Sequence, residues 1–282
     1  MRGSRLGELA LGAGTWLVGA LFASMLSLLL VRGVRATGSW SRLVTVLTGV
    51  PRELEVGGGI GPQIYNTVYL ALLSLLFAAP IAIAAAAWLA RFAREGVLLS
   101  AVRVALDSLA SLPSVVYGLF GFLLFVVWLK LGYTVLGGAL VLACLNLPVL
   151  VGLSEEALRS TPRALEEASL ALGASRVQTL LRVTLPHAAP GILSAVVLAF
   201  GRVFAESAPL IYTAGLSTDP RTPYSLSPLR SGETLAVHLW YLGSSGVVPD
   251  RHVIAAASAA VLVVLAIGTT MLGHALSPRR AV

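Results

Sequence analysis

Arginine and an acidic residue stand four positions apart in two stretches that are otherwise largely apolar. The first stretch, LAFGRVFAESAPL, contains Arg202 and Glu206. The second, SAVRVALDSLASLPSVVYGLF, contains Arg103 and Asp107. On a helix this spacing brings the two side chains to one face, where they can form an ion pair. A guanidinium group can also hold an oxyanion through two parallel hydrogen bonds, so these residues are candidates for an anion site.

The chain around these residues is too apolar for a water-soluble protein. Only 12% of its 282 residues are charged, against about 25% in soluble domains. Blocks without any charged residue occupy positions 9–31, 56–90, 108–129, 131–154 and 253–276. Each block is long enough for a membrane helix, which needs roughly 20 apolar residues. We therefore predict an all-α, polytopic membrane protein.

A sixth span is predicted at 190–212, which is apolar except for Arg202 and Glu206. Placing an arginine at the centre of a membrane helix costs roughly 2.5–3.5 kcal/mol. A buried ion pair is no more stabilising than apolar residues of similar size. Stability therefore does not explain this pair, whereas a polar pathway or an anionic cargo would.

Polar residues continue the second pair along the predicted helix. Ser108, Ser111, Ser114 and Tyr117 follow Asp107 at helical spacing. Such a stripe can line a pathway or form a packing seam of small residues between helices, and the sequence leaves both open. The candidate pathway residues are Arg202, Glu206, Arg103, Asp107, Ser114 and Tyr117.

Six spans would place both termini on the same side of the membrane. Slightly more arginines fall in the segments on the side of the termini, which favours the cytoplasm for both. The first apolar block exceeds the roughly 7–15 apolar residues of a secretory signal, so we expect a retained helix. Within the outer loop at 216–250, the short apolar segment TLAVHLWYLG is expected to form an interfacial or re-entrant helix.

A charged segment at 154–186, SEEALRSTPRALEEASLALGASRVQTLLRVTLP, separates the fourth and fifth predicted spans. Thr161 is expected to cap a helix that has the following proline at its first position and that stops at Gly173. Ser175 is expected to cap a second helix, which Pro186 ends. The pattern predicts a cytoplasmic helical hairpin, which on pattern alone is either a solvated connector or a docking surface.

Several kinds of chemistry find no support in the sequence. GGGIGP at 57–62 lacks the GK[ST] ending of an ATP-binding loop, so ATP would have to bind another chain. Cys144 is the only cysteine, and the four histidines lack metal-ligand spacing. The arginines are scattered between apolar blocks, which argues against nucleic-acid binding. We therefore expect no metal, no cofactor, no nucleic-acid partner and no enzyme activity.

The hairpin carries a pattern, EAS-x3-G-x9-VTLP, that resembles the EAA loop of ABC importer permeases. Ser169 and Val183 stand where that family more often has alanine and isoleucine. In the family the loop docks into the ATP-binding subunit. The resemblance implies that coupling to the ATPase involves Glu167, Ala168, Gly173, Ala174 and Ser175.

A finer resemblance, to the PstA family of phosphate permeases, covers most of the chain from position 57 to 276. It rests on GGGIGP, LPSVVYGLF, NLPVLVGLSEEALRSTPRALEEASLALGAS, GRVFAESAPL and TLAVHLWYL. The family more often writes the fourth of these ARxxGETAPL, and here Gly201, Ala205 and Ser207 depart from that pattern. The family associates the arginine and the glutamate of this motif, here Arg202 and Glu206, with phosphate translocation.

The resemblance implies a six-helix permease subunit of the type I, MetI-like kind that imports inorganic phosphate through the cell membrane. It divides the chain into a first helix with its outer loop at 1–56 and a five-helix permease core at 57–277. The implied partners are two copies of a PstB-like ATP-binding subunit, a PstC-like second permease, a PstS-like phosphate-binding protein and the lipid bilayer.

Other functions stay open beside this one. A permease of the same fold could carry molybdate, sulfate or phosphonate instead. A rival of another class is an anion transporter driven by an ion gradient, which inverted repeats would favour; no convincing internal duplication is present, and the hairpin argues against it. A membrane-embedded hydrolase is weaker still, because the chain lacks a nucleophile–base or metal constellation.

Overall fold

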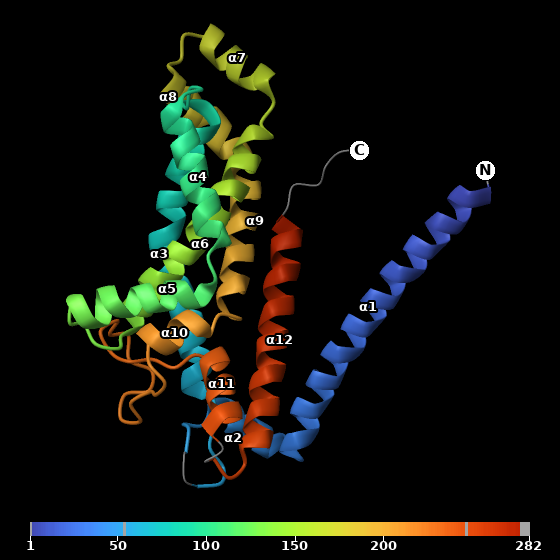
Figure 1. Ribbon diagram of the computed structural model, residues 1–282, viewed down its shortest axis with the longest axis vertical. Coiled ribbons are helices and arrows are strands. Elements are labelled where there is room, and N and C mark those ends of the chain that lie inside the picture. Colours follow the sequence, from blue (N-terminus) through green and yellow to red (C-terminus); the bar gives the residue numbers. More distant parts are fainter. Residues whose placement is uncertain (1, 53–54, 246–247, 277–282) are drawn as a thin grey trace.

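The computed structural model describes residues 2–52, 55–245 and 248–276, and all regular structure within these ranges is helical. Figure 1 shows an elongated bundle in which long helices run between its two ends. Five described helices are long and apolar enough to cross a membrane, or six if one bent pair forms a single span. The prediction of an all-α, polytopic protein is confirmed. Position 277 and the last two arginines, which entered the domain and topology predictions, lie outside the described residues.

The first helix, α1 (Arg2–Thr37), lies apart from the bundle and packs mainly against the last one, α12 (Arg251–Leu276). Close packing requires a glycine at position 33, since a Cβ atom there would lie 2.5 Å from Cβ of Ala260. Farther toward its start, α1 exposes large apolar side chains such as Trp16 and Phe22. The short α2 (Trp40–Thr48) follows, at the end of the molecule away from the start of α1.

Three helices form the centre: α3 (Gly61–Arg91), α6 (Val135–Arg159) and α9 (Leu185–Val203). Leu75, Leu150 and Ala199, one from each helix, belong to the same buried apolar cluster. The glycine-rich segment before α3 leads into the helix with a proline in its first turn. This packed centre holds the polar residues described below.

The third apolar block, predicted as a span at 108–129, is bent in the structure. It forms α4 (Val97–Ser111), α5 (Ser114–Gly121) and the π-helical segment η1 (Phe122–Trp128), with a bend of 98° between α4 and the α5–η1 part. Leu112 is extended because the ring of Pro113 disfavours the helical conformation in the residue before it. The Tyr117 hydroxyl donates to the Leu109 carbonyl at 2.8 Å and so braces the bend.

The span predicted at 190–212 is also interrupted. Helix α9 ends at Val203, and α10 (Ala208–Thr213) begins after a short turn. Pro209 lacks the N–H that would continue the hydrogen-bond ladder, so it is accommodated in the first turn of a new helix. Arg202 therefore lies in the last turn of α9 and Glu206 in the turn that follows, not in mid-helix as expected.

The predicted hairpin is present at one end of the molecule, as α7 (Arg163–Ala171) and α8 (Arg176–Thr179). Gly173 has φ +84° and turns the chain, and Ser175 caps α8 in a capping box with Gln178; both expectations are confirmed. Two details of the prediction are wrong. The residue at the N-cap of α7 is a proline rather than Thr161. Pro186 does not end the second helix, because it falls in the first turn of α9, where a residue without an N–H is tolerated.

Helix α8 instead continues through a π-helical turn, η2 (Leu180–Thr184), into α9. At the end of the molecule opposite the hairpin, α11 (Leu235–Ser245) lies near α2. It is a helix too short to span a membrane, as predicted for this segment. In Figure 1 the start of α1 and the end of α12 point toward the hairpin end.

Candidate functional site

Arg202 and Glu206 form a loose pair at the break between α9 and α10. The guanidinium Nε lies 3.7 Å from Oε1 of Glu206, which is too long for a hydrogen bond. The Arg202 side chain is 46% exposed and that of Glu206 is 17% exposed in this single chain. The guanidinium therefore has N–H groups available for another partner, and the carboxylate offsets its charge while none is present.

The bent helix α5 lies directly against this break. A Cβ atom on Gly118 would come within 2.8 Å of Cα of Pro209, so the two backbones approach more closely than a residue with a side chain at position 118 would allow. Tyr117, the neighbour of this glycine, lies on the same short helix, which Ser114 begins, half-buried. The structure thus brings the helix that carries Tyr117 and Ser114 to the break beside the pair.

The second predicted pair does not form as expected, because Arg103 bonds to Glu155 on α6. Its two terminal nitrogens lie 2.8 and 2.6 Å from the two carboxylate oxygens in a bidentate contact. Arg159 adds a third hydrogen bond to the same carboxylate at 2.8 Å. Asp107 is exposed one turn along α4. Whether Asp107 belongs to the pathway stays a prediction.

The sequence reasoning missed Glu155, although its carboxylate binds both Arg103 and Arg159. We call these three residues the clamp. The Glu155 side chain is only 6% exposed, and a buried carboxylate must be neutralised by partners. The available signal was a pair of glutamates, Glu155 and Glu156, immediately after an apolar block. Nothing in the sequence distinguishes the buried one from its exposed neighbour.

The residues predicted to couple to an ATPase gather at the tip of the hairpin. Glu167, Ala168, Gly173 and Ser175 are exposed, and Ala174 is half-buried. Between them Leu172 projects with 90% of its surface exposed.

Glu166, not the neighbouring Glu167, connects the hairpin to the bundle. Its carboxylate lies 2.6 Å from Arg91 at the end of α3, and it accepts a hydrogen bond from Thr184 in η2 at 3.0 Å. Sequence reasoning did not select Glu166, because on a helix it differs from Glu167 only in the face it occupies.

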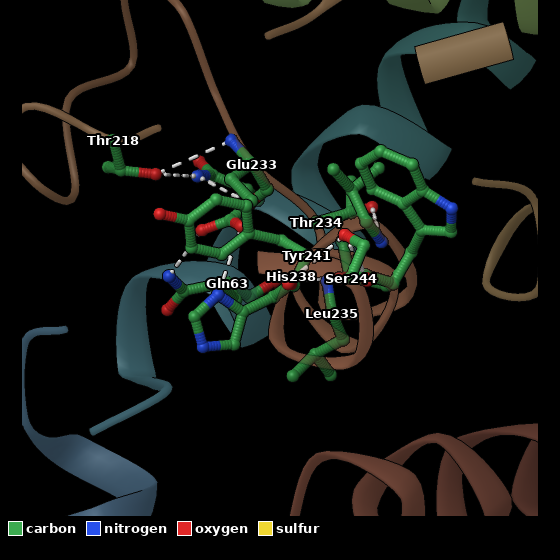
Figure 2. A network of polar contacts seen from close by, with 12 residues as sticks. Gln63, Thr218, Glu233, Thr234, Leu235, His238, Tyr241 and Ser244 are labelled. Atoms are coloured by element: carbon green, nitrogen blue, oxygen red, sulfur yellow. Dashed lines mark hydrogen bonds and ion pairs between the residues drawn. The ribbon is translucent and has the colours of Figure 1, made fainter. Parts of the chain in front are cut away.

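A buried polar network occupies the opposite end of the molecule (Figure 2). Glu233 lies at its centre, 2.9 Å from Nδ1 of His238 and 2.8 Å from the Gln63 amide nitrogen that donates to it. Asn66 donates to the Glu233 carbonyl at 3.0 Å. The network joins the start of α11 to α3, so it fixes the loop that precedes α11 on the core. The sequence offered only a glutamate beside an apolar segment as a signal.

Neither the apolar cavity beside α12 nor the described ionisable residues indicate a catalytic or metal site. A cavity of about 700 Å³ lies between α1, α11, α12 and the break after α9, with mostly apolar walls that include Phe204 and Trp240. It does not include Arg202 or Glu206. Among the described residues, no three of the His, Cys, Asp and Glu side chains are grouped as a metal site requires.

Comparison with known proteins places these features in a family. Residues 78–282 match the family model described as "Binding-protein-dependent transport system inner membrane component". The chain is 39% identical over 258 residues to the "Probable ABC transporter permease protein YqgI" of Bacillus subtilis, covering 88% of this chain and 86% of that protein. It is 34% identical to the "Phosphate transport system permease protein PstA" of Mycobacterium leprae over 68% of this chain and 63% of that protein.

Solved structures share the fold. A chain of the bacterial alginate ABC transporter, in complex with an alginate-bound periplasmic protein, superposes with a TM-score of 0.65 at 20% identity, covering 99% of this chain and 95% of that chain. A chain of the MetNI methionine ABC transporter, in an inward-facing conformation, gives a TM-score of 0.60 at 18% identity over 78% and 96% of the two chains. The fold is therefore that of MetI-like importer permeases, and by sequence and fold together the chain belongs to the family of binding-protein-dependent transport system inner membrane components.

Proposed function

We propose that this permease imports inorganic phosphate, with Arg202 and Glu206 in its translocation pathway. The observation that carries the proposal is the loose contact of 3.7 Å between these two residues at a helix break. They stand in a motif, GRVFAESAPL, that resembles the phosphate permeases. Relatives named as phosphate transport permeases, such as that of Xylella fastidiosa at 34% identity over 61% of this chain, support the same substrate.

The chemistry of the pair suits a transported anion. In the empty state Glu206 limits the cost of an unpaired charge near the membrane interior, which would be roughly 3–5 kcal/mol if Arg202 were fully buried. Phosphate can replace the carboxylate because the guanidinium geometry matches its oxygens. The displaced carboxylate then keeps the site from binding too tightly, and a transported ion must be able to leave. Tyr117 and Ser114 complete this wall of the pathway.

The remaining wall must come from another subunit, because Arg202 is half-exposed in the single chain. We assign it to a second permease of the same fold, with residues 57–277 as the core that packs against it. The hairpin at 154–186 and both termini face the cytoplasm, where the exposed Leu172 and the coupling residues dock on one of two ATP-binding subunits that hydrolyse ATP. A phosphate-binding protein delivers the anion to the opposite end, near the network around Glu233.

Substrate identity is tested by uptake. The assembled transporter, with its ATPase and binding protein, is reconstituted in liposomes, and radiolabelled phosphate accumulation is measured with ATP inside. We expect excess unlabelled phosphate to abolish the uptake of radiolabel, and the same concentration of sulfate or molybdate to leave it unchanged. Stronger competition by sulfate or molybdate would assign the permease to another oxyanion. Uptake that follows an ion gradient without ATP would remove the ABC mechanism altogether.

A further inference from the structure

A chain of polar contacts runs along the hairpin end of the molecule, from α7 to α4. It begins at Glu166 on α7, which contacts Arg91 at 2.6 Å. It ends at Glu155 on α6, whose carboxylate holds Arg103 of α4 through bonds of 2.6 and 2.8 Å. Glu166 and Glu155 do not contact one another, so the contacts between them decide whether this series of polar contacts is continuous.

The steps between them are made by two arginines that cross-link the ends of α3 and α6. Arg91 donates to the Leu158 carbonyl of α6 at 2.7 Å. Arg159 donates to the Leu89 carbonyl of α3 at 3.3 Å and to Glu155 at 2.8 Å. Each arginine thus binds one glutamate and the backbone of the opposite helix. We call Glu166, Arg91, Arg159, Glu155 and Arg103 the inner relay.

The hairpin end of the inner relay is held mainly by polar contacts. Helix α7 has no buried residue. A cavity of about 190 Å³ separates part of the hairpin from the end of α3, with Glu166, Arg91 and Thr184 among its walls. Thr184 belongs to the π-helical turn η2, and such turns are frequent at functional sites. A push on the exposed hairpin tip would therefore act first on the contacts of Glu166.

The other end of the inner relay is held in the same way. Helix α4 has no buried residue either, and the 98° bend at Pro113 separates it from α5. Apolar side chains of α4 such as Val102 rest on the central cluster from one side only. The bidentate contact of Arg103 with Glu155 ties α4 to α6, and the Tyr117 bond to the Leu109 carbonyl ties its end to α5 at the bend.

We propose that the inner relay transmits the movement of the coupling hairpin to α4, and that α4 acts as a hinged arm over the inner mouth of the pathway. Glu166 and Glu155 are positioning residues in this device, since neither contacts the proposed anion site. The proposal rests on the proposed function, because it needs an ATPase that moves the hairpin. It assigns to Glu166 a role separate from that of the exposed Glu167.

The test measures phosphate uptake and ATP hydrolysis in the same liposomes that contain the complete transporter. The variants are Glu166→Gln, Arg103→Gln and the two combined, and Glu156→Gln is the matched control because Glu156 is the exposed neighbour of Glu155. We expect each single variant to keep hydrolysing ATP while phosphate moved per ATP falls about two- to thirtyfold, the range for residues in a coupling network. The combined variant should be no worse than the more severe single one, because both interrupt one relay.

Two results would overturn the proposal: unchanged coupling in both single variants, or losses that simply multiply in the combined variant, as expected of two unrelated structural defects. If Glu166→Gln does not assemble, Glu166→Asp lengthens the same contact and is measured in its place. If the unmodified transporter moves no phosphate, the proposed function fails on its own. The inner relay is then tested by measuring how much the binding protein increases ATP hydrolysis. The single and combined variants must lose this increase to the same extent.

Discussion

Arg202 and Arg103 each have an acidic residue four positions on in the sequence, yet the structure gives the two arginines different kinds of glutamate contact. Arg202 and Glu206 are 3.7 Å apart at a helix break, with Arg202 half-exposed. Arg103 and Glu155 share two bonds of 2.6 and 2.8 Å, with Glu155 buried and also bonded to Arg159. A bidentate, charge-assisted contact is the stronger kind. The comparison indicates a site that exchanges partners in the first case and a fixed clamp in the second.

The largest effect is expected at the loose pair. Arg202→Leu should insert and assemble but lose phosphate uptake by roughly thirtyfold or more, because it removes the guanidinium that would bind the anion, and hydrogen bonds to charged groups contribute about 1.5–3 kcal/mol each. Arg202→Lys should also transport poorly, because a point charge lacks the two-pronged geometry. Radiolabelled phosphate uptake, in membranes where assembly with the ATPase is verified, measures both variants. Normal uptake by Arg202→Leu would show that the pair is only an internal salt bridge with no role in transport.

A second effect is expected at the hairpin turn. Gly173 has φ +84°, and a residue with a side chain in that region costs roughly 1–3 kcal/mol. Gly173→Val should therefore displace the exposed tip and lower phosphate moved per ATP by about fivefold or more. Gly152→Ala is the control, because a Cβ there meets nothing within 4 Å. Co-purification of the ATPase reports docking, and unchanged docking and uptake in Gly173→Val would show that the turn is not a coupling element.

The helical membrane fold was predictable because it follows from composition and block length. The hairpin turn was predictable too, since Gly173 and Ser175 act through local backbone preferences that the sequence carries. The breaks at Pro113 and Pro209 were missed, although each proline has a local cause. The length of an apolar block predicts a span and carries no information on a bend within it.

The candidate site was only partly predictable, because ion-pair partners depend on tertiary packing. The i, i+4 spacing predicted a contact between Arg103 and Asp107, yet α6 offers a buried carboxylate that binds Arg103 in bidentate geometry. Glu155 and Glu166 were overlooked for the same reason. Each has an adjacent glutamate, and only the packing of α6 and α7 decides which member of each pair faces inward.

A third effect, on stability, distinguishes the clamp from the loose pair. Glu155→Gln should destabilise the protein by about 1.5–3 kcal/mol, the range for hydrogen bonds to charged groups. Arg103→Gln should cost less, because Arg159 still neutralises the buried carboxylate. Thermal unfolding of the purified permease in detergent measures both, with Glu156→Gln expected within about 0.5 kcal/mol of the unmodified protein. Equal losses in Glu155→Gln and Glu156→Gln would contradict the clamp.

The smallest effect is expected at Asp107, which the sequence pairs with Arg103 and the structure leaves exposed. Because Arg103 is already satisfied by Glu155, neutralising Asp107 removes no short contact of the clamp. Asp107→Asn should keep phosphate uptake within about twofold, a change equivalent to the 0.5 kcal/mol typical of surface substitutions. Uptake at several phosphate concentrations separates the maximal rate from the half-saturating concentration. A loss as large as that of Arg202→Leu would put α4 in the lining of the pathway, and the contrast between a fixed clamp and an exchanging pair would then no longer hold.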